Sequence, residues 1–203
     1  KERTQGMIPA RNRGFNEAKY DIIARTDADT ILPPNWIKRI KKSFAEDDKL
    51  MGLSGPVQYY ELPKVITSTY RVSVNTAFKS YIRIVARILH HPFMIGPNMS
   101  LRKTAWNKVK NDVCLDDKKV HEDIDLSIHL APFGEIRFDQ RLILKTSFRR
   151  WKKWDAYPEY LYRTMTSIRN HQHIRVGASS VRAIKNFLSK TLILEAEPKN
   201  PRG

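Results

Sequence analysis

The amino-acid sequence predicts an α/β fold, with a mostly parallel sheet and helices on its flanks. Two observations indicate this fold class. Short runs rich in apolar and β-branched residues alternate along the 203 residues with segments of helical periodicity. In addition, 41% of the residues are apolar and 29% are charged, which excludes a collagenous, low-complexity or disordered chain. A chain of this length can bury the core of one domain with a small appendage.

The strand and helix patterns follow one another along the chain. The run YDIIAR at residues 20–25 is typical of a buried strand, and an acidic turn follows it. Pro33 and Pro34 favour the first turn of a helix, in which Trp36 and Ile40 then stand at helical spacing. The strand patterns cover residues 20–25, 50–60, 96–101 and 136–144, and Gly55-Pro56 interrupts the second of them. The helical patterns cover residues 12–20, 36–44, 64–90, 104–110, 122–130 and 158–194.

The longest helical pattern, residues 64–90, has an apolar face and ends before Pro92. A row of basic residues also lies along it, namely Arg71, Lys79, Arg83 and Arg87. The pattern over 122–130 opens with acidic residues, which complement the positive end of a helix dipole. We therefore expect an α/β domain over residues 1–154 and a basic helical tail over residues 155–203.

The charge of the chain is strongly positive. Lys and Arg number 37 and Asp and Glu number 21, which gives a formal net charge of +16, and residues 138–203 hold 14 basic but only 5 acidic residues. Such an excess favours a polyanionic partner: nucleic acid, an anionic membrane surface or a phosphate-bearing ligand. No apolar run reaches the length that spans a bilayer. A single cysteine excludes a disulfide framework and predicts a cytoplasmic location.

Two acidic motifs are candidates for chemistry. Asp27 and Asp29 follow an apolar strand, where two carboxylates in one turn can face a hard cation such as Mg²⁺ or Mn²⁺; the alternative is an Asx turn that ends the strand. Glu122 and Asp123 open a helix, where a carboxylate can act as a general base; the alternative is simple complementation of the helix dipole. Each motif alone leaves both interpretations open.

Two further segments could contact a ligand. In GPNMSLR at residues 96–102, Asn98 could hydrogen-bond a polyhydroxylated ligand, or the segment could be a connector. In RRW at residues 149–151, arginine suits phosphate and tryptophan suits stacking on a sugar or base, or the segment could be a solvated basic stretch. The histidines include His171 and His173, which lack the i, i+4 spacing of a helical metal pair. We assign the histidines to structural or surface positions.

Together, and in their order, these segments resemble family 2 glycosyltransferases. The family has an A-R-N-x-G-x-x-x-A segment, and ARNRGFNEA at residues 10–18 is similar to it. An apolar strand ending in D-x-D follows, as in IIARTDADT at residues 22–30. The segment 96–102 resembles the G-x-N-M-x-x-R acceptor-side turn of the family, HED at 121–123 its E-D pair, and RRW at 149–151 its late R-W or R-R segment.

The resemblance implies the A-type glycosyltransferase fold and a nucleotide-sugar donor. It implies that Asp29 binds Mg²⁺ or Mn²⁺, which neutralises the nucleotide diphosphate. Asp27 would contact the ribose or share the metal, and Arg11 would lie near the nucleotide. The reaction implied is the inverting transfer of a hexose to a glycan or lipid-linked acceptor in cell-surface glycan synthesis.

The resemblance also implies roles on the acceptor side. Asp123 would deprotonate the acceptor hydroxyl, and Glu122 would support it. Other residues would bind the acceptor or the diphosphate, namely Asn98, Arg102, Arg149, Arg150 and Trp151. The first strands of the family are not matched, so we expect about 70 to 90 residues of such a domain to be missing before Lys1, judged from the length of βαβ units.

Two other functions are compatible with the charge. A nucleic-acid-binding protein is disfavoured, because the sequence contains no known nucleic-acid motif. A peripheral membrane module is the other alternative, because the segment 174–194 combines apolar and basic residues at helical spacing. This second alternative is compatible with glycosyl transfer, and it would place the chain on the inner face of the membrane.

Overall fold

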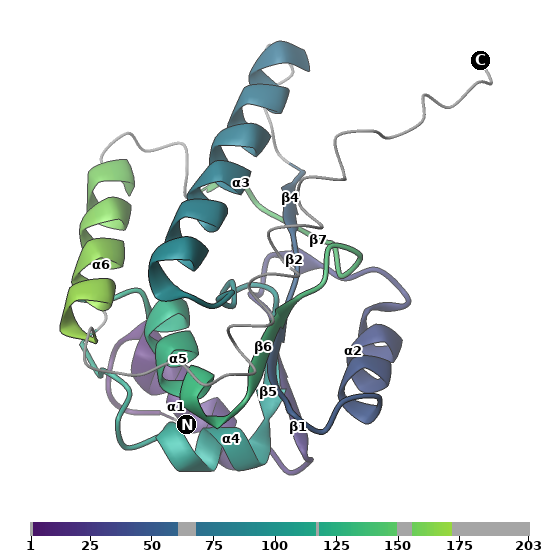
Figure 1. The fold of residues 1–203 in the computed structure, drawn as a ribbon, viewed down its shortest axis with the longest axis vertical. Coiled ribbons are helices and arrows are strands. Elements are labelled where there is room, and N and C mark those ends of the chain that lie inside the picture. Colours follow the sequence, from purple (N-terminus) through teal and green to yellow (C-terminus); the bar gives the residue numbers. More distant parts are fainter. Residues whose placement is uncertain (1, 61–67, 117, 150–155, 172–203) are drawn as a thin grey trace.

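The computed structural model describes residues 2–60, 68–116, 118–149 and 156–171, which form a mixed α/β fold (Figure 1). The helices are α1 Met7–Glu17, α2 Trp36–Ala45, α3 Ser68–Leu89, α4 Lys103–Val109, α5 Glu122–Leu130 and α6 Ala156–Asn170, with a 3₁₀ turn over Ala131–Phe133. The strands are β1 Ile22–Arg25, β2 Thr30–Ile31, β3 Leu50–Ser54, β4 Val57–Tyr59, β5 Met99–Arg102, β6 Glu135–Phe138 and β7 Leu144–Thr146. The predicted α/β fold class is confirmed.

The strands form two small sheets, and their pairing is mixed. The first sheet has the order β1-β5-β3-β6, in which β5 runs antiparallel to both neighbours and β3 and β6 are parallel. The second has the order β2-β7-β4, with β2 antiparallel and β4 parallel to β7. The expected mostly parallel sheet is therefore corrected, because β5 returns between β1 and β3 in the opposite direction.

Two segments with strand patterns each cross from one sheet to the other; the first was expected to be interrupted at Gly55 and Pro56, and the second was expected to be a single strand. Residues 50–60 divide into β3 and β4 at Gly55, and residues 136–144 divide at a turn between β6 and β7. The two crossings lie against each other, since Asp139 donates its backbone N–H to Ser54 and Leu144 donates to Pro56. A Cβ at Gly55 would collide with the carbonyl oxygen of Leu142, so this close approach requires glycine.

The helices lie on both sides of the sheets. Figure 1 shows α2 on one side of the first sheet, and α1, α4 and α5 on the other. Helix α5 has the predicted bounds of 122–130, whereas α1 begins five residues before the expected residue 12. None of the described helices has the length and apolar character that crossing a membrane requires. The domain boundary at residue 154 stays a prediction, and the tail from residue 172 onward lies outside the described residues.

Helix α5 lies at the centre of the molecule. Its apolar residues pack into both core clusters: Ile124 lies with α2 and α3, and Leu126 lies with Trp106 of α4. Its first turn is also buried, although it carries Glu122, Asp123 and Asp125. Buried carboxylates are costly unless they are paired or hydrogen-bonded. Helix α5 is therefore the element around which charged groups from other segments gather.

Candidate functional site

A pocket of about 570 Å³ is lined by five of the eight predicted site residues that the structure describes. We call it the central pocket. Asp27 and Asp29 enter it from the turn after β1, Glu122 and Asp123 from the start of α5, and Arg149 from the segment after β7. The fold thus brings together three motifs that lie far apart in the sequence. Arg150 and Trp151 of the third motif lie outside the described residues.

Asp27 and Asp29 remain accessible in this pocket. The side chain of Asp27 is 40% exposed and that of Asp29 is 35% exposed. Thr146 donates its hydroxyl hydrogen to Asp29 Oδ1 at 3.2 Å, and Arg149 Nη2 lies 3.5 Å from Oδ2. Accessible carboxylate oxygens suit a hard cation such as Mg²⁺ or Mn²⁺, which usually binds together with substrate phosphates. The donor set therefore fits the metal that the sequence predicts.

Asp123 is a buried carboxylate at the wall of the same pocket, with 8% of its surface exposed. Its Oδ2 accepts the backbone N–H of Gly96 at 3.0 Å, which fixes the side chain. Burial, together with the negative charge of Glu122, raises the pKa of Asp123 above its usual value. A carboxylate with a raised pKa is a stronger base, so this residue is suited to accept a proton from a substrate.

Glu122 differs from its neighbour because it is paired with a cation. Arg25 Nη1 lies 2.8 Å from Glu122 Oε1, and both side chains are largely buried. Although burial opposes the charge of Glu122, the Arg25 guanidinium holds the pKa of Glu122 below its usual value. The pKa values of the two adjacent acids are therefore shifted in opposite directions. Glu122 is shifted toward the ionised form, and Asp123 toward the protonated form. Such a separation assigns different roles to the two carboxyls.

Arg25 is a site residue that the sequence analysis missed. Besides its pair with Glu122, its Nη2 lies 3.4 Å from Asp27 Oδ1, so it connects the two acidic motifs. A charged residue at the end of an otherwise apolar strand was the available signal. Tyr160 of α6 was also missed; it lines the pocket, and burial raises its pKa well above the ordinary value. Nothing in the local sequence of α6 indicates this contact.

Arg11 lies behind the central pocket, and the pocket lining does not include it. It is buried, and its Nη1 donates to the backbone carbonyl of Glu122 at 2.7 Å. Burial lowers the pKa of Arg11 below its usual value, and the charge of Glu122 offsets this effect only in part. The position holds α1 against the first turn of α5. The structure therefore gives Arg11 contacts with the helix that carries the acids; its predicted contact with the nucleotide stays a prediction.

Asn98 and Arg102 do not line the central pocket, and their expected contacts with the acceptor stay a prediction. Asn98 is fully buried; its Oδ1 accepts from Trp36 Nε1 at 3.0 Å, and its Nδ2 donates to the carbonyl oxygen of Leu142 at 2.6 Å. Arg102 donates to the backbone carbonyls of Phe44, Asp47 and Leu50. Both side chains use their polar groups to bind neighbouring backbone and α2. Their role in this structure is to hold elements together.

Comparisons with known proteins give a family and a fold. Residues 1–109 match the sequence profile of glycosyl transferase family 2. No curated protein matches the chain in sequence. Among solved structures, the mannosyltransferase PcManGT from Pyrobaculum calidifontis, in complex with GDP-Man and Mn²⁺, matches 96% of this chain with 13% identity and a TM-score of 0.52. A mycobacterial protein matches 71% of this chain and 42% of its own, with 12% identity and a TM-score of 0.37, which is too low to carry an argument.

The mannosyltransferase is longer than this chain, which spans 57% of it. The likeness establishes the A-type glycosyltransferase fold that the sequence resemblance implies. The family profile covers residues 1–109, which include Asp27 and Asp29. Because this match extends over more than half of the 203 residues, the chain belongs to glycosyl transferase family 2.

Proposed function

We propose that the central pocket transfers a hexose from a nucleotide-diphosphate donor to an acceptor hydroxyl, with inversion and with Mg²⁺ or Mn²⁺ bound. One observation carries this proposal. Two accessible carboxylates, Asp27 and Asp29, share a pocket of about 570 Å³ with the buried carboxylate of Asp123. The first pair suits a metal and a diphosphate, and the second suits proton removal.

The sugar donor would bind at the Asp27 and Asp29 end. A divalent cation bound there supplies positive charge that stabilises the diphosphate as it leaves. Arg149, which lies beside Asp29, adds a second positive charge on the same side of the pocket. The mannosyltransferase in complex with GDP-Man and Mn²⁺ supports a donor of this class.

The acceptor would react at the Asp123 end. Asp123 takes the proton of the acceptor hydroxyl, whose oxygen forms a bond to the anomeric carbon of the donor. The bond between that carbon and the diphosphate oxygen breaks, and its electron pair leaves with the diphosphate. The configuration inverts because the base and the leaving group lie on opposite faces of the sugar. The backbone N–H of Gly96 positions Asp123, while Glu122 and Arg25 remain ionised as a pair beside it.

The sugar donor can be identified by thermal unfolding of the full chain with UDP-, GDP- and TDP-sugars, with and without Mn²⁺. We expect one nucleotide class, present at 100 times its Kd, to add about 2.7 kcal/mol, which corresponds to roughly 5 to 10 °C in Tm. The shift should require Mn²⁺ and should disappear in Asp29→Asn. Asp112→Asn, which removes an exposed carboxylate outside the pocket, is the matched control. A shift that is unchanged in Asp29→Asn would contradict the metal assignment.

The role of Asp123 is tested by Asp123→Asn. We expect transfer to fall at least about 100-fold while the Mn²⁺-dependent binding of the sugar donor is retained, because only the proton acceptor is lost. In the wild type, the rate should rise with pH through the raised pKa of Asp123, since only the ionised carboxylate accepts a proton. Product formation against pH measures both effects, and full activity of the variant would disprove the assignment.

The membrane location is a further part of this proposal. On α3, the side chains of Ile84 and Ile88 are 55% and 49% exposed, and Arg87 on the same helix is also exposed. Apolar side chains beside a basic one suit the surface of an anionic bilayer. Vesicles of anionic lipid should co-sediment with the chain more than neutral vesicles do, and Ile84→Ser with Ile88→Ser should reduce binding. Equal sedimentation with both lipids would contradict it.

A further inference from the structure

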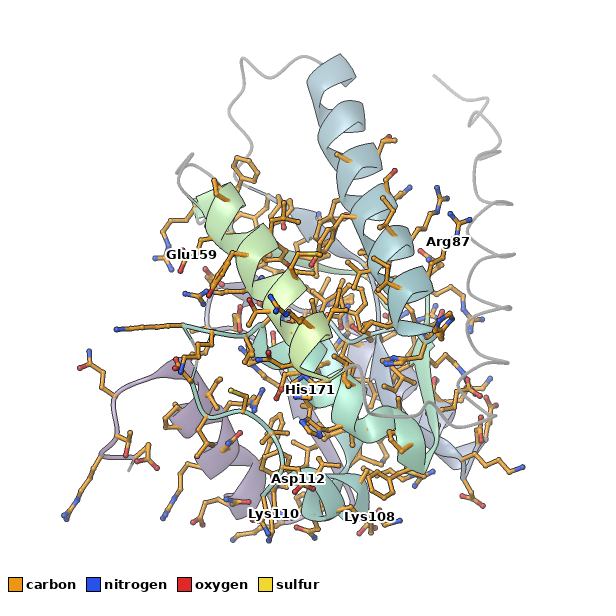
Figure 2. The ribbon with its side chains drawn as sticks, turned by 60° about the vertical axis from the view of Figure 1, so that its left-hand side comes forward. Arg87, Lys108, Lys110, Asp112, Glu159 and His171 are labelled. Carbon is orange, nitrogen blue, oxygen red and sulfur yellow. The ribbon has the colours of Figure 1, made fainter. Side chains whose placement is uncertain are left out.

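A second cluster of titratable side chains lies outside the central pocket. Asp125 and His129 stand one helical turn apart on α5, and His171 follows the last turn of α6. Figure 2 shows His171 at this end of α6, where the helix crosses α5. We call these three residues the Asp125 cluster. Asp125 comes two positions after Asp123, so the two carboxylates lie on different sides of α5.

The three side chains converge on one point. Asp125 Oδ1 lies 3.2 Å from His171 Nε2 and 3.7 Å from His129 Nε2, and one ligand atom from each residue lies within 4.8 Å of the others. Ligands at about 2.0 to 2.2 Å from a tetrahedral zinc ion lie roughly 3.3 Å from one another. The cluster is therefore close to the size of a metal site and needs only small side-chain movements to close around an ion.

The hydrogen bonds of the cluster leave the atoms that could bind a metal facing the point where the three side chains converge. His171 Nδ1 lies 2.7 Å from the backbone carbonyl of Ser167, so Nδ1 carries the hydrogen and donates it. In the neutral ring, Nε2 then presents a lone pair to Asp125. Metal-binding histidines commonly donate their second ring N–H to a carbonyl in this way. His171 is thus oriented and held in the tautomer that binds a metal.

Asp125 offers one oxygen in the same direction. It is fully buried, and its Oδ2 accepts the backbone N–H of Cys114 at 3.0 Å. Its Oδ1, also buried, accepts no hydrogen bond from the described residues. A carboxylate oxygen and an imidazole lone pair at 3.2 Å repel each other unless a positive charge lies between them. A proton or a metal ion can supply that charge, and two imidazoles with one carboxylate favour a metal such as Zn²⁺.

Solvent can reach the cluster from one side. His129 and His171 line a second pocket of about 480 Å³, together with Asp112 and Asn170, and their side chains are 11% and 10% exposed. A zinc ion bound by three protein ligands keeps a fourth position for water. The pocket provides room for that water and a path for the ion.

We propose that Asp125, His129 and His171 bind one Zn²⁺ ion, in a site separate from the central pocket, and that the ion fastens α6 to α5. The ligands differ from those of the central pocket, where carboxylates alone favour Mg²⁺ or Mn²⁺. This site revises the assignment of the histidines from sequence. His171 has its partners on α5, more than 40 positions earlier, and not at His173.

The test uses the full chain without a histidine purification tag, freed of metal by chelation. The background variant Asp29→Asn removes the predicted metal ligand of the central pocket. Co²⁺ is titrated and followed by visible absorption, and Zn²⁺ is then added as a competitor and measured by calorimetry. We expect one Co²⁺ per chain, with bands typical of four or five nitrogen and oxygen ligands, and displacement by Zn²⁺.

Single variants identify the ligands. His129→Gln and His171→Gln should each weaken Zn²⁺ binding by more than about tenfold and should abolish the rise in Tm that Zn²⁺ causes. His90→Asn is the matched control: it removes an exposed histidine outside the cluster, and asparagine tolerates the φ of 58° at this position. Circular dichroism without metal checks folding, and His171→Gln at the helix end serves if His129→Gln does not fold. No binding to the wild type, or unchanged binding in these variants, would overturn the proposal.

Discussion

At the scale of single residues, the ion pair of Arg25 and Glu122 makes a large predictable contribution to stability. The two side chains are 14% and 7% exposed. Breaking a buried pair leaves one charge without compensation, which costs several kcal/mol. We therefore expect Arg25→Met to lower the free energy of unfolding by about 3 kcal/mol at pH 7, since Glu122 is then buried without its main cation. Chemical denaturation measures this change.

The pH dependence of Arg25→Met provides a check. In the wild type, the lowered pKa of Glu122 gives stability that is present above its unfolded pKa and is lost as the pH falls from there through its lower folded pKa. Without Arg25, burial raises this pKa, so the deficit of the variant should shrink in acid as Glu122 takes a proton. Arg13→Met removes an exposed pair with Glu17 and should cost less than about 1 kcal/mol. If Arg25→Met and Arg13→Met lowered the free energy of unfolding equally, the buried ion pair would contribute no more to stability than the exposed one.

The residues of the site were predictable to different degrees. Asp27, Asp29, Glu122 and Asp123 could be recognised because the members of each pair lie within three residues of each other in the sequence, and the fold places them in one pocket. Arg25 could not, because its partner Glu122 lies 97 positions away. Local sequence indicates which residues can do chemistry. It does not indicate which cation will stand beside a given carboxylate.

At the scale of elements, Asn98 connects α2 to the segments that cross between the sheets. It accepts from Trp36 Nε1 and donates to the backbone carbonyls of Leu142 and Pro56. Asn98→Ala leaves two buried polar groups without this partner, the Trp36 indole N–H and the Leu142 carbonyl, and each such group costs about 1 to 3 kcal/mol. We expect the variant to lose about 3 kcal/mol or more of stability. Thermal and chemical unfolding measure the loss.

The same variant separates a structural role from a ligand contact. At a temperature where Asn98→Ala is folded, KM for the acceptor should be close to that of the wild type, because Asn98 lies outside the central pocket. Asn35→Ala is a suitable control, since Asn35 is exposed at the start of α2 and its side chain makes no capping hydrogen bond. It should change stability by less than about 0.5 kcal/mol. A large rise in KM with normal stability would show instead that Asn98 contacts the acceptor.

At this scale, sequence patterns determine the ends of helix α5, but they do not determine how β3 and β4 are assigned to the two sheets. The acids at the start of α5 and the Pro-Phe-Gly segment after it fix its ends, so its bounds agree with the prediction. The run over 50–60 has the apolar character of one strand, but it belongs to two sheets. An alternating apolar pattern indicates that a strand is buried on one face of a sheet. It does not indicate to which of two sheets the strand belongs.

At the scale of the whole molecule, the fold class was predictable and the direction of the strands was not. The alternation of strands and helices indicates α/β, whereas the antiparallel position of β5 depends on contacts with β1 and β3 across the sheet. The α5–α6 contact, which brings His171 to Asp125, is likewise a property of the assembled molecule.

A buried histidine predicts how the stability of the whole molecule depends on pH. Burial lowers the pKa of His91 from its ordinary 6.5 to about 4. The unfolded state therefore binds more protons between these two values, and stability falls as the pH is lowered through them. The loss from this group should approach about 3 kcal/mol, at 1.36 kcal/mol for each pKa unit.

Urea denaturation at intervals from pH 7 to pH 4 measures this slope. His91→Asn cannot titrate and should have a flatter pH dependence, with a smaller loss between pH 6.5 and pH 4. His90→Asn, which removes the exposed neighbour, should keep the slope of the wild type. Parallel curves for His91→Asn and the wild type would show that another group causes the acid sensitivity.

The central pocket has a consequence for the order of events during folding. Thr146 and Asp29, which meet there, are 117 positions apart, and Arg25 and Glu122 are 97 apart. Closing such long loops costs chain entropy before the contacts can return any free energy. The pocket therefore forms only when both ends of the domain have assembled. Nucleotide binding by refolding chains should therefore be detected only when folding is complete, whereas secondary structure should be detected at the beginning of folding.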